Sequence, residues 1–128
     1  MINFIDLLGR ICISAIFLFS GVNKILNYEG TIEWMGGFGV PGIFLIPAII
    51  LEIIFPILII VGYQTKIAAS ILSLFCLTTA FIFHNEFSNQ MQIIAFLKNI
   101  GLTAGLLFLI INGTKDWSLE RKKKYVRL

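Results

Sequence analysis

The fold is decided by an apolar stretch at residues 42–63, which reads GIFLIPAIILEIIFPILIIVGY. It contains one charged residue, Glu52, and it is long enough to cross the roughly 30 Å hydrocarbon core of a bilayer as a helix. Three more apolar stretches lie at about residues 2–26, 67–84 and 93–112. We therefore expect an all-α integral membrane protein whose single domain is a four-helix bundle over these ranges.

The composition supports a membrane environment. The chain has 128 residues, of which 58% are hydrophobic and 13% charged, whereas soluble domains are about 45–50% apolar and about 25% charged. A chain this short could not bury so much apolar surface in water. Four strands could not close a barrel in lipid, so helices are expected to span the bilayer.

The positive charges predict the orientation. Lys66 lies in a short connection, and six more cations lie in the tail at residues 113–128. They are Lys115, Arg121, Lys122, Lys123, Lys124 and Arg127. Because Lys and Arg concentrate in cytoplasmic loops, both termini are expected to be cytoplasmic. Without a groove-reading motif, the basic tail indicates contact with anionic lipid rather than nucleic acid.

Several ionisable residues lie where apolar residues would be expected. Arg10, Glu52 and Lys98 fall inside apolar stretches, while Lys24 and His84 lie at helix ends. Such residues in a membrane span are costly and usually functional. The alternatives are that the charges specify helix packing and that His84 is a helix-end residue in contact with water.

A helical period of about 100° per residue predicts one face for each helix. In the first stretch the face holds Arg10, Ser14, Phe17, Gly21 and Lys24. In residues 42–63 it holds Leu45, Glu52, Pro56 and Ile59. In residues 67–84 it holds Ser70, Ser73, Leu77, Ala80 and His84. In the last stretch it holds Ile94, Lys98, Gly101 and Gly105. Small residues on these faces indicate helix contacts.

The polar residues gather in the outer half of the expected bundle. They are Lys24, Glu52, His84, Lys98 and Asn99. Glu52 and Lys98 lie at similar depth, so we expect them to form an ion pair at the floor of a ligand site. Pro56 leaves the Glu52 carbonyl without its helical partner. Arg10 lies alone in the inner half, where we expect it to pair with Asp6 and extend to the headgroups.

The remaining candidates favour no cysteine or metal chemistry. Cys12 and Cys76 lie in apolar stretches without a C-x-x-C spacing or a nearby histidine. We expect no disulfide between them, no metal site and no covalently bound cofactor. The connection at residues 27–41 contains several glycines, and residues 31–35 are expected to form one helical turn.

Short motifs on three of the four stretches resemble the DoxX family. They are Gly9-Arg10 with Phe17-x-x-Ser20-Gly21-x-x-Lys24, Pro47 with Glu52 and Gly62-Tyr63, and Phe96-Leu97-Lys98-Asn99. The resemblance covers nearly the whole chain. It implies a four-helix protein of the bacterial inner membrane, and some family members are linked to quinone-dependent sulfur oxidation or defence against thiol stress. Arg10, Lys24, Glu52 and Lys98 are carried over by their position in these motifs.

Three functions then compete. The first is a quinone-interacting subunit of a membrane oxidoreductase system, in which an electron-donating protein partner supplies the electrons and the polar cluster exchanges protons with a quinone. The second is a small-solute transporter, which four helices without an inverted repeat would achieve as a homo-oligomer. The third is a structural or assembly subunit whose charges specify packing.

Overall fold

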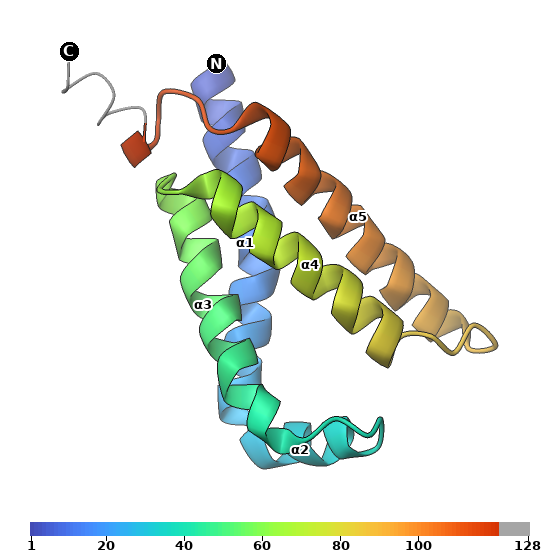
Figure 1. Ribbon diagram of the computed structural model, residues 1–128. Coiled ribbons are helices and arrows are strands. Elements are labelled where there is room, and N and C mark those ends of the chain that lie inside the picture. Colours follow the sequence, from blue (N-terminus) through green and yellow to red (C-terminus); the bar gives the residue numbers. More distant parts are fainter. Residues whose placement is uncertain (121–128) are drawn as a thin grey trace.

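The computed structural model describes residues 1–120. Its elements are α1 (Ile2–Leu26), α2 (Tyr28–Gly36), the 3-10 helix η1 (Gly42–Phe44), α3 (Leu45–Val61), α4 (Thr65–Phe83) and α5 (Gln90–Asn112) (Figure 1). Four of them, counting η1 with α3, are long and apolar enough to cross a membrane. The prediction of an all-α, four-helix membrane bundle is thereby confirmed.

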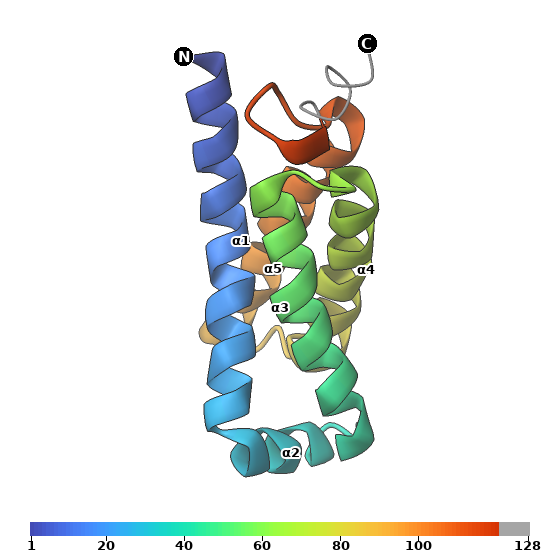
Figure 2. The same ribbon diagram turned by 90° about the vertical axis from the view of Figure 1, so that its left-hand side faces the viewer.

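The helices pack as two pairs. α1 lies against α3, and α4 lies against α5 (Figures 1 and 2). The N-terminus, the α3–α4 turn and the end of α5 lie at one end of the bundle, which we call the terminal end. The opposite end carries α2 and is called the α2 end. The α4–α5 hairpin diverges from α1 and α3 towards the α2 end (Figure 1).

The core lies where the two pairs still touch. Phe17 of α1 and Ile59 of α3 meet α4 there, and Ala68 and Ala69 of α4 are fully buried. Small side chains allow helices in a membrane to approach closely, which favours van der Waals packing where lipid offers no hydrophobic driving force. The α4 contact therefore holds the bundle together near its terminal end, and the two helix pairs separate towards the α2 end.

α2 is longer than the single turn expected at residues 31–35. It has nine residues and begins directly after Asn27, at the end of α1. Asn27 lies between α1 and α2 with φ −118° and ψ 45°, which is not a helical conformation, and Pro41 has an extended ψ of 140° before η1. α2 therefore crosses the end of the bundle rather than extending α1.

The first residues after α5 form a folded segment at the terminal end. The Glu120 carboxylate accepts a hydrogen bond from the Thr65 backbone N–H. The backbone N–H of Glu120 donates to the Gly62 carbonyl. Gly62 has φ +74°, and a Cβ there would lie 2.2 Å from Ser118 Cβ. Only glycine fits this turn. The basic residues expected at 121–128 lie outside the described residues.

The outward surface is apolar. Phe19, Ile43, Leu74, Phe108 and Ile111 are each more than three-fifths exposed, and they are spread over all four spans. Exposing this apolar surface to water would be unfavourable, whereas contact with lipid hydrocarbon is not. The exposed belt therefore marks the bilayer-facing surface.

Candidate functional site

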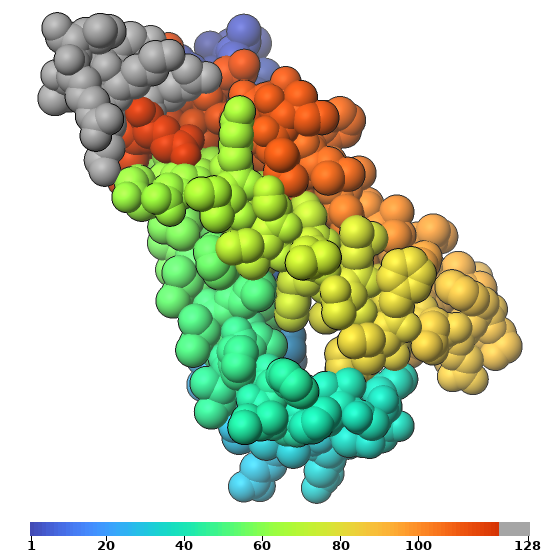
Figure 3. Space-filling model, viewed as in Figure 1, coloured from blue at the N-terminus to red at the C-terminus, as the bar shows by residue number. Residues whose placement is uncertain are grey.

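A cavity of about 720 Å³ lies between the α1–α3 pair and the α4–α5 hairpin. Its walls include Phe17, Leu51 and Phe75, and residues of α2 and the loop after it close one end. The space-filling view is hollowed between α3, α2 and α4 (Figure 3). Ligand sites commonly have about 300–1,000 Å³. The divergence of the helix pairs therefore leaves a space of ligand size that opens sideways.

An ion pair forms part of the wall. Lys24 Nζ donates to Glu52 Oε2 at 2.7 Å and to Ser20 Oγ at 2.8 Å, and Ser20 Oγ donates to Glu52 Oε1 at 3.2 Å. The Glu52 side chain is 4% exposed, while that of Lys24 is 22% exposed. Ser20 and Lys24 are four residues apart, which places both on the α1 face towards α3. The three side chains form one closed polar cluster.

Close helix contact makes this cluster possible. A Cβ at Gly21 would lie 3.0 Å from Ile53 Cδ1 and 3.3 Å from Glu52 Cβ. The absence of a side chain at Gly21 therefore lets α1 approach α3 beside Glu52. Pro56 follows one turn later in α3 and is also buried.

The expected pairing of Glu52 with Lys98 is wrong. Lys24 is the partner of Glu52, because α1 packs directly on α3 whereas α5 lies across the cavity. Lys98 lines the opposite wall of the same cavity. The structure thus brings all three residues to one site but pairs them differently.

His84 and Asn99 also line the cavity, and both are bound to neighbours. His84 Nδ1 lies within hydrogen-bond distance of Gln92 Oε1, at 2.9 Å. Asn99 Nδ2 donates to the Cys76 carbonyl and to Thr79 Oγ1. Asn99 therefore joins α5 to α4, while His84 joins the end of α4 to the start of α5.

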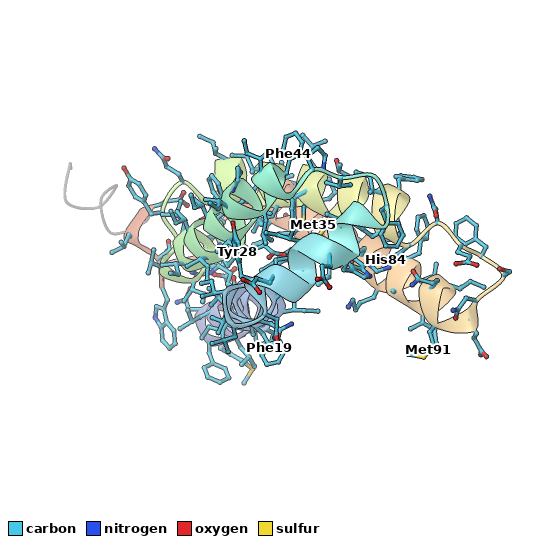
Figure 4. The ribbon with its side chains drawn as sticks, turned by 90° about the horizontal axis from the view of Figure 1, so that it is seen from below. Phe19, Tyr28, Met35, Phe44, His84 and Met91 are labelled. Carbon is cyan, nitrogen blue, oxygen red and sulfur yellow. The ribbon has the colours of Figure 1, made fainter. Side chains whose placement is uncertain are left out.

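Aromatic residues close the α2 end of the cavity. Trp34 of α2 stacks on Phe83 of α4 with ring centroids 4.5 Å apart, and Phe38 packs edge-on against both rings. Met35 of α2 is 6% exposed, and the view from this end shows it at α2, with His84 to one side (Figure 4). Phe19 and Met91 lie at the periphery of the same view. The sequence analysis predicted one helical turn at residues 31–35 but did not identify it as a wall of the site.

Arg10 is not part of the cavity. Its Nε donates to Asp6 Oδ2 at 3.0 Å, which confirms the expected pairing. Its remaining nitrogens donate to the carbonyls of Ile59, Ile60 and Trp117, and the residue is 1% exposed. The expectation that Arg10 extends to the headgroups is therefore wrong, because the end of α3 and the segment after α5 offer it carbonyls inside the protein.

The two cysteines have different surroundings. Cys12 is exposed on α1, Cys76 is buried in α4 against the cavity, and both are free thiols. Within residues 1–120, no three His, Cys, Asp or Glu side chains are grouped so that they could hold a metal ion.

Comparison with known proteins identifies the family. The DoxX family model matches residues 5–85, which include most of α1 and all of α2, α3 and α4. The inner membrane protein YqjF of Escherichia coli is 36% identical over 90% of this chain and 88% of its own length. The inner membrane protein YphA of the same organism is 31% identical over 91% of this chain and 88% of its own. No solved structure matches the chain. The chain is an integral membrane protein that belongs to the DoxX family.

Proposed function

We propose that this protein is a quinone-interacting subunit of a membrane oxidoreductase system and that the quinone head group binds in the cavity. The observation that carries the proposal is the combination of a mostly apolar space with two lysines and one carboxylate in its wall. A quinone combines an apolar ring and tail with two carbonyl oxygens. An apolar pocket with a few placed polar groups suits such a ligand.

The route of entry follows from the surface. Quinones with isoprenoid tails dissolve in the bilayer, and the cavity opens between helices whose outer faces are apolar (Figure 3). A tail can remain in lipid while the ring lies between Leu51 and Phe75. The ligand then needs no passage through water.

The polar cluster can supply protons. Reduction of a quinone to a quinol consumes two electrons and two protons, one proton for each oxygen. Lys24 and Lys98 are donors to the carbonyl oxygens, and Glu52 accepts a proton from the bulk side and passes it on. An electron-donating protein partner supplies the two electrons.

The location of the protein is part of this proposal. Both named relatives are inner membrane proteins, and Lys66 and Lys115 lie towards the terminal end. We place the chain in the bacterial inner membrane with both termini cytoplasmic. The cavity then lies in the periplasmic half of the bilayer.

The test uses the redox state of the membrane quinone pool. Cells that express the protein should differ from cells that lack it in the ratio of quinone to quinol. Ala48→Phe fills the cavity from α3 and should abolish the difference. Ala104→Phe places the same ring on the exposed face of α5 and should preserve it. An unchanged ratio with and without the native protein would contradict the proposal.

A further inference from the structure

The charges in the cavity wall do not balance. Lys24, Glu52, His84 and Lys98 are its acidic and basic side chains. Glu52 is the one carboxylate among them, and Lys24 lies 2.7 Å from it. His84 is held through Nδ1 by the neutral side chain of Gln92. Apart from His84, two lysines face one carboxylate, so the cavity wall carries at least one positive charge in excess.

Lys98 is the source of that excess. Within residues 1–120, no carboxylate oxygen lies within 4.0 Å of its ammonium group, since the ion pairs there are Arg10–Asp6 and Lys24–Glu52. Lys98 lies about 12 Å along α5 from Gln90, at 1.5 Å per residue. The backbone of Lys98 therefore lies within a membrane span, and its side chain is exposed where it lines the cavity.

An uncompensated cation inside a bilayer is costly. A neutral ligand would leave the positive charge of Lys98 uncompensated. An anionic ligand would compensate this charge and accept a charge-assisted hydrogen bond from Lys98. The apolar walls strengthen this attraction, because they lower the local dielectric constant.

We propose that the cavity binds its ligand as an anion, with the negative charge of the head group at Lys98 and the apolar body against the α3 and α4 walls. This inference rests on the proposed function and narrows its ligand class. The ligand is a quinone whose ring carries an acidic hydroxyl, ionised at neutral pH, or the deprotonated quinol formed on reduction. The charge of Lys24 is already compensated by Glu52, so we assign the recognition of the anion to Lys98.

The test compares two ligands of similar shape that differ in charge. A 2-hydroxy-3-alkyl-1,4-naphthoquinone is anionic at neutral pH, and its 2-methoxy ether is neutral and similar in shape. Binding to the full-length protein in nanodiscs of neutral lipid is measured by ligand depletion, with partition into protein-free nanodiscs subtracted. The hydroxy compound should bind at least about tenfold more tightly, as expected for one charge-assisted hydrogen bond.

Two matched variants locate the charge that recognises the ligand. Lys98→Met should remove most of the difference between the two compounds, and Lys98→Arg should retain it. Lys66→Met is the control, because Lys66 is an exposed lysine at the start of α4, at the terminal end. It should leave the preference unchanged.

The outcomes separate this inference from the proposed function. Equal affinity of the native protein for both compounds would overturn the anionic ligand while leaving a quinone site in place. An undiminished preference in Lys98→Met would also overturn it, since Lys98 would then extend to the headgroups. Binding of neither compound would overturn the quinone site itself. The comparison of the two ligands on the native protein decides the question even if the Lys98 variants fail to fold.

Discussion

Lys24 Nζ lies 2.7 Å from Glu52 Oε2 and thereby joins the last turn of α1 to the middle of α3. The two ends of this bond differ in their surroundings, because the Lys24 side chain is 22% exposed and that of Glu52 is 4% exposed. A lysine near a helix end can extend to the headgroups, whereas a carboxylate in the middle of α3 has no such escape. The pair is therefore asymmetric.

This asymmetry predicts unequal costs of breaking the pair. Lys24→Met leaves Glu52 buried without its cation and should lower the free energy of unfolding by about 3 kcal/mol, as for other buried pairs. Glu52→Gln should cost clearly less, since Lys24 can reach the membrane surface. The measurement is denaturant unfolding of the purified variants in mixed micelles.

The double change completes the cycle. Lys24→Met with Glu52→Gln should be more stable than Lys24→Met alone, because no buried charge then remains. Costs that simply add in the double variant would show that the two side chains do not interact. Ligand binding should be lost in the double variant if the pair acts on the ligand and retained if it only packs.

A second prediction concerns the α3–α4 turn. Gly62→Ala should destabilise the protein by about 3 kcal/mol, because a non-glycine residue there is strained by about 1–2 kcal/mol and its Cβ overlaps Ser118. Gly9→Ala is the control, since a Cβ at Gly9 has no heavy atom within 4 Å. Thermal unfolding should separate the two variants, and similar melting temperatures would refute the fit of Ser118 against the turn.

A third prediction tests Arg10. Arg10→Lys keeps the charge but cannot reproduce a planar group that bonds Asp6 and three carbonyls at once. We expect a loss of about 2–3 kcal/mol, since buried acceptors are left unsatisfied. Limited proteolysis near Trp117 should also accelerate. Native-like stability and protection would contradict the role of Arg10 as the anchor of the segment after α5.

The sequence predicted two helix faces correctly. The buried residues of α1 are Arg10, Ser14, Phe17 and Gly21, and those of α3 are Leu45, Glu52, Pro56 and Ile59, as expected from a period of 100° per residue. These two helices pack along one face each, so a single stripe describes them. The polar residues of these two faces lie at the contact between α1 and α3, where Lys24 pairs with Glu52.

The other two faces were harder to predict. α4 contacts both α3 and α5, so its buried residues spread over a wider arc that includes Ala68, Leu72 and Cys76, and Ser70 is exposed. The expected face of α5 was drawn through Lys98 and Gly101, whereas Thr103 and Leu106 are buried. Lys98 points to the cavity and not to a helix, so its position gave the wrong face. No periodicity within one helix encodes the divergence of two helix pairs.

Of the two glycines on the expected face of α5, one lies at a helix contact and the other does not. A Cβ at Gly105 would lie 2.9 Å from Ile13 of α1, whereas Gly101 has nothing within 4 Å. The divergence of α5 from α1 towards the α2 end explains this difference. The docking of Glu120 and Ser118 could not be predicted either, because it depends on contacts between residues distant in the chain.

The orientation yields a fourth prediction. A reporter active only in the periplasm should be inactive when fused at Leu128 and active when inserted at residues 85–89, between α4 and α5. A reporter active only in the cytoplasm should give the opposite pattern. Periplasmic activity at Leu128 would invert the proposed topology and place the cavity in the cytoplasmic half.

The cavity itself can be tested with the two tryptophans of the chain. Trp34 lines the cavity, and Trp117 lies at the terminal end, where its carbonyl binds Arg10. Trp117→Phe leaves Trp34 as the reporter, and Trp34→Phe leaves Trp117 as the matched control. Both variants are titrated in nanodiscs with a short-tailed quinone, a quencher of tryptophan fluorescence. We predict saturable quenching of Trp34, abolished by Ala48→Phe, and only weak, non-saturating quenching of Trp117. Equal, non-saturating quenching of both tryptophans would show that the quinone merely partitions into the lipid and would contradict a binding site between the two helix pairs.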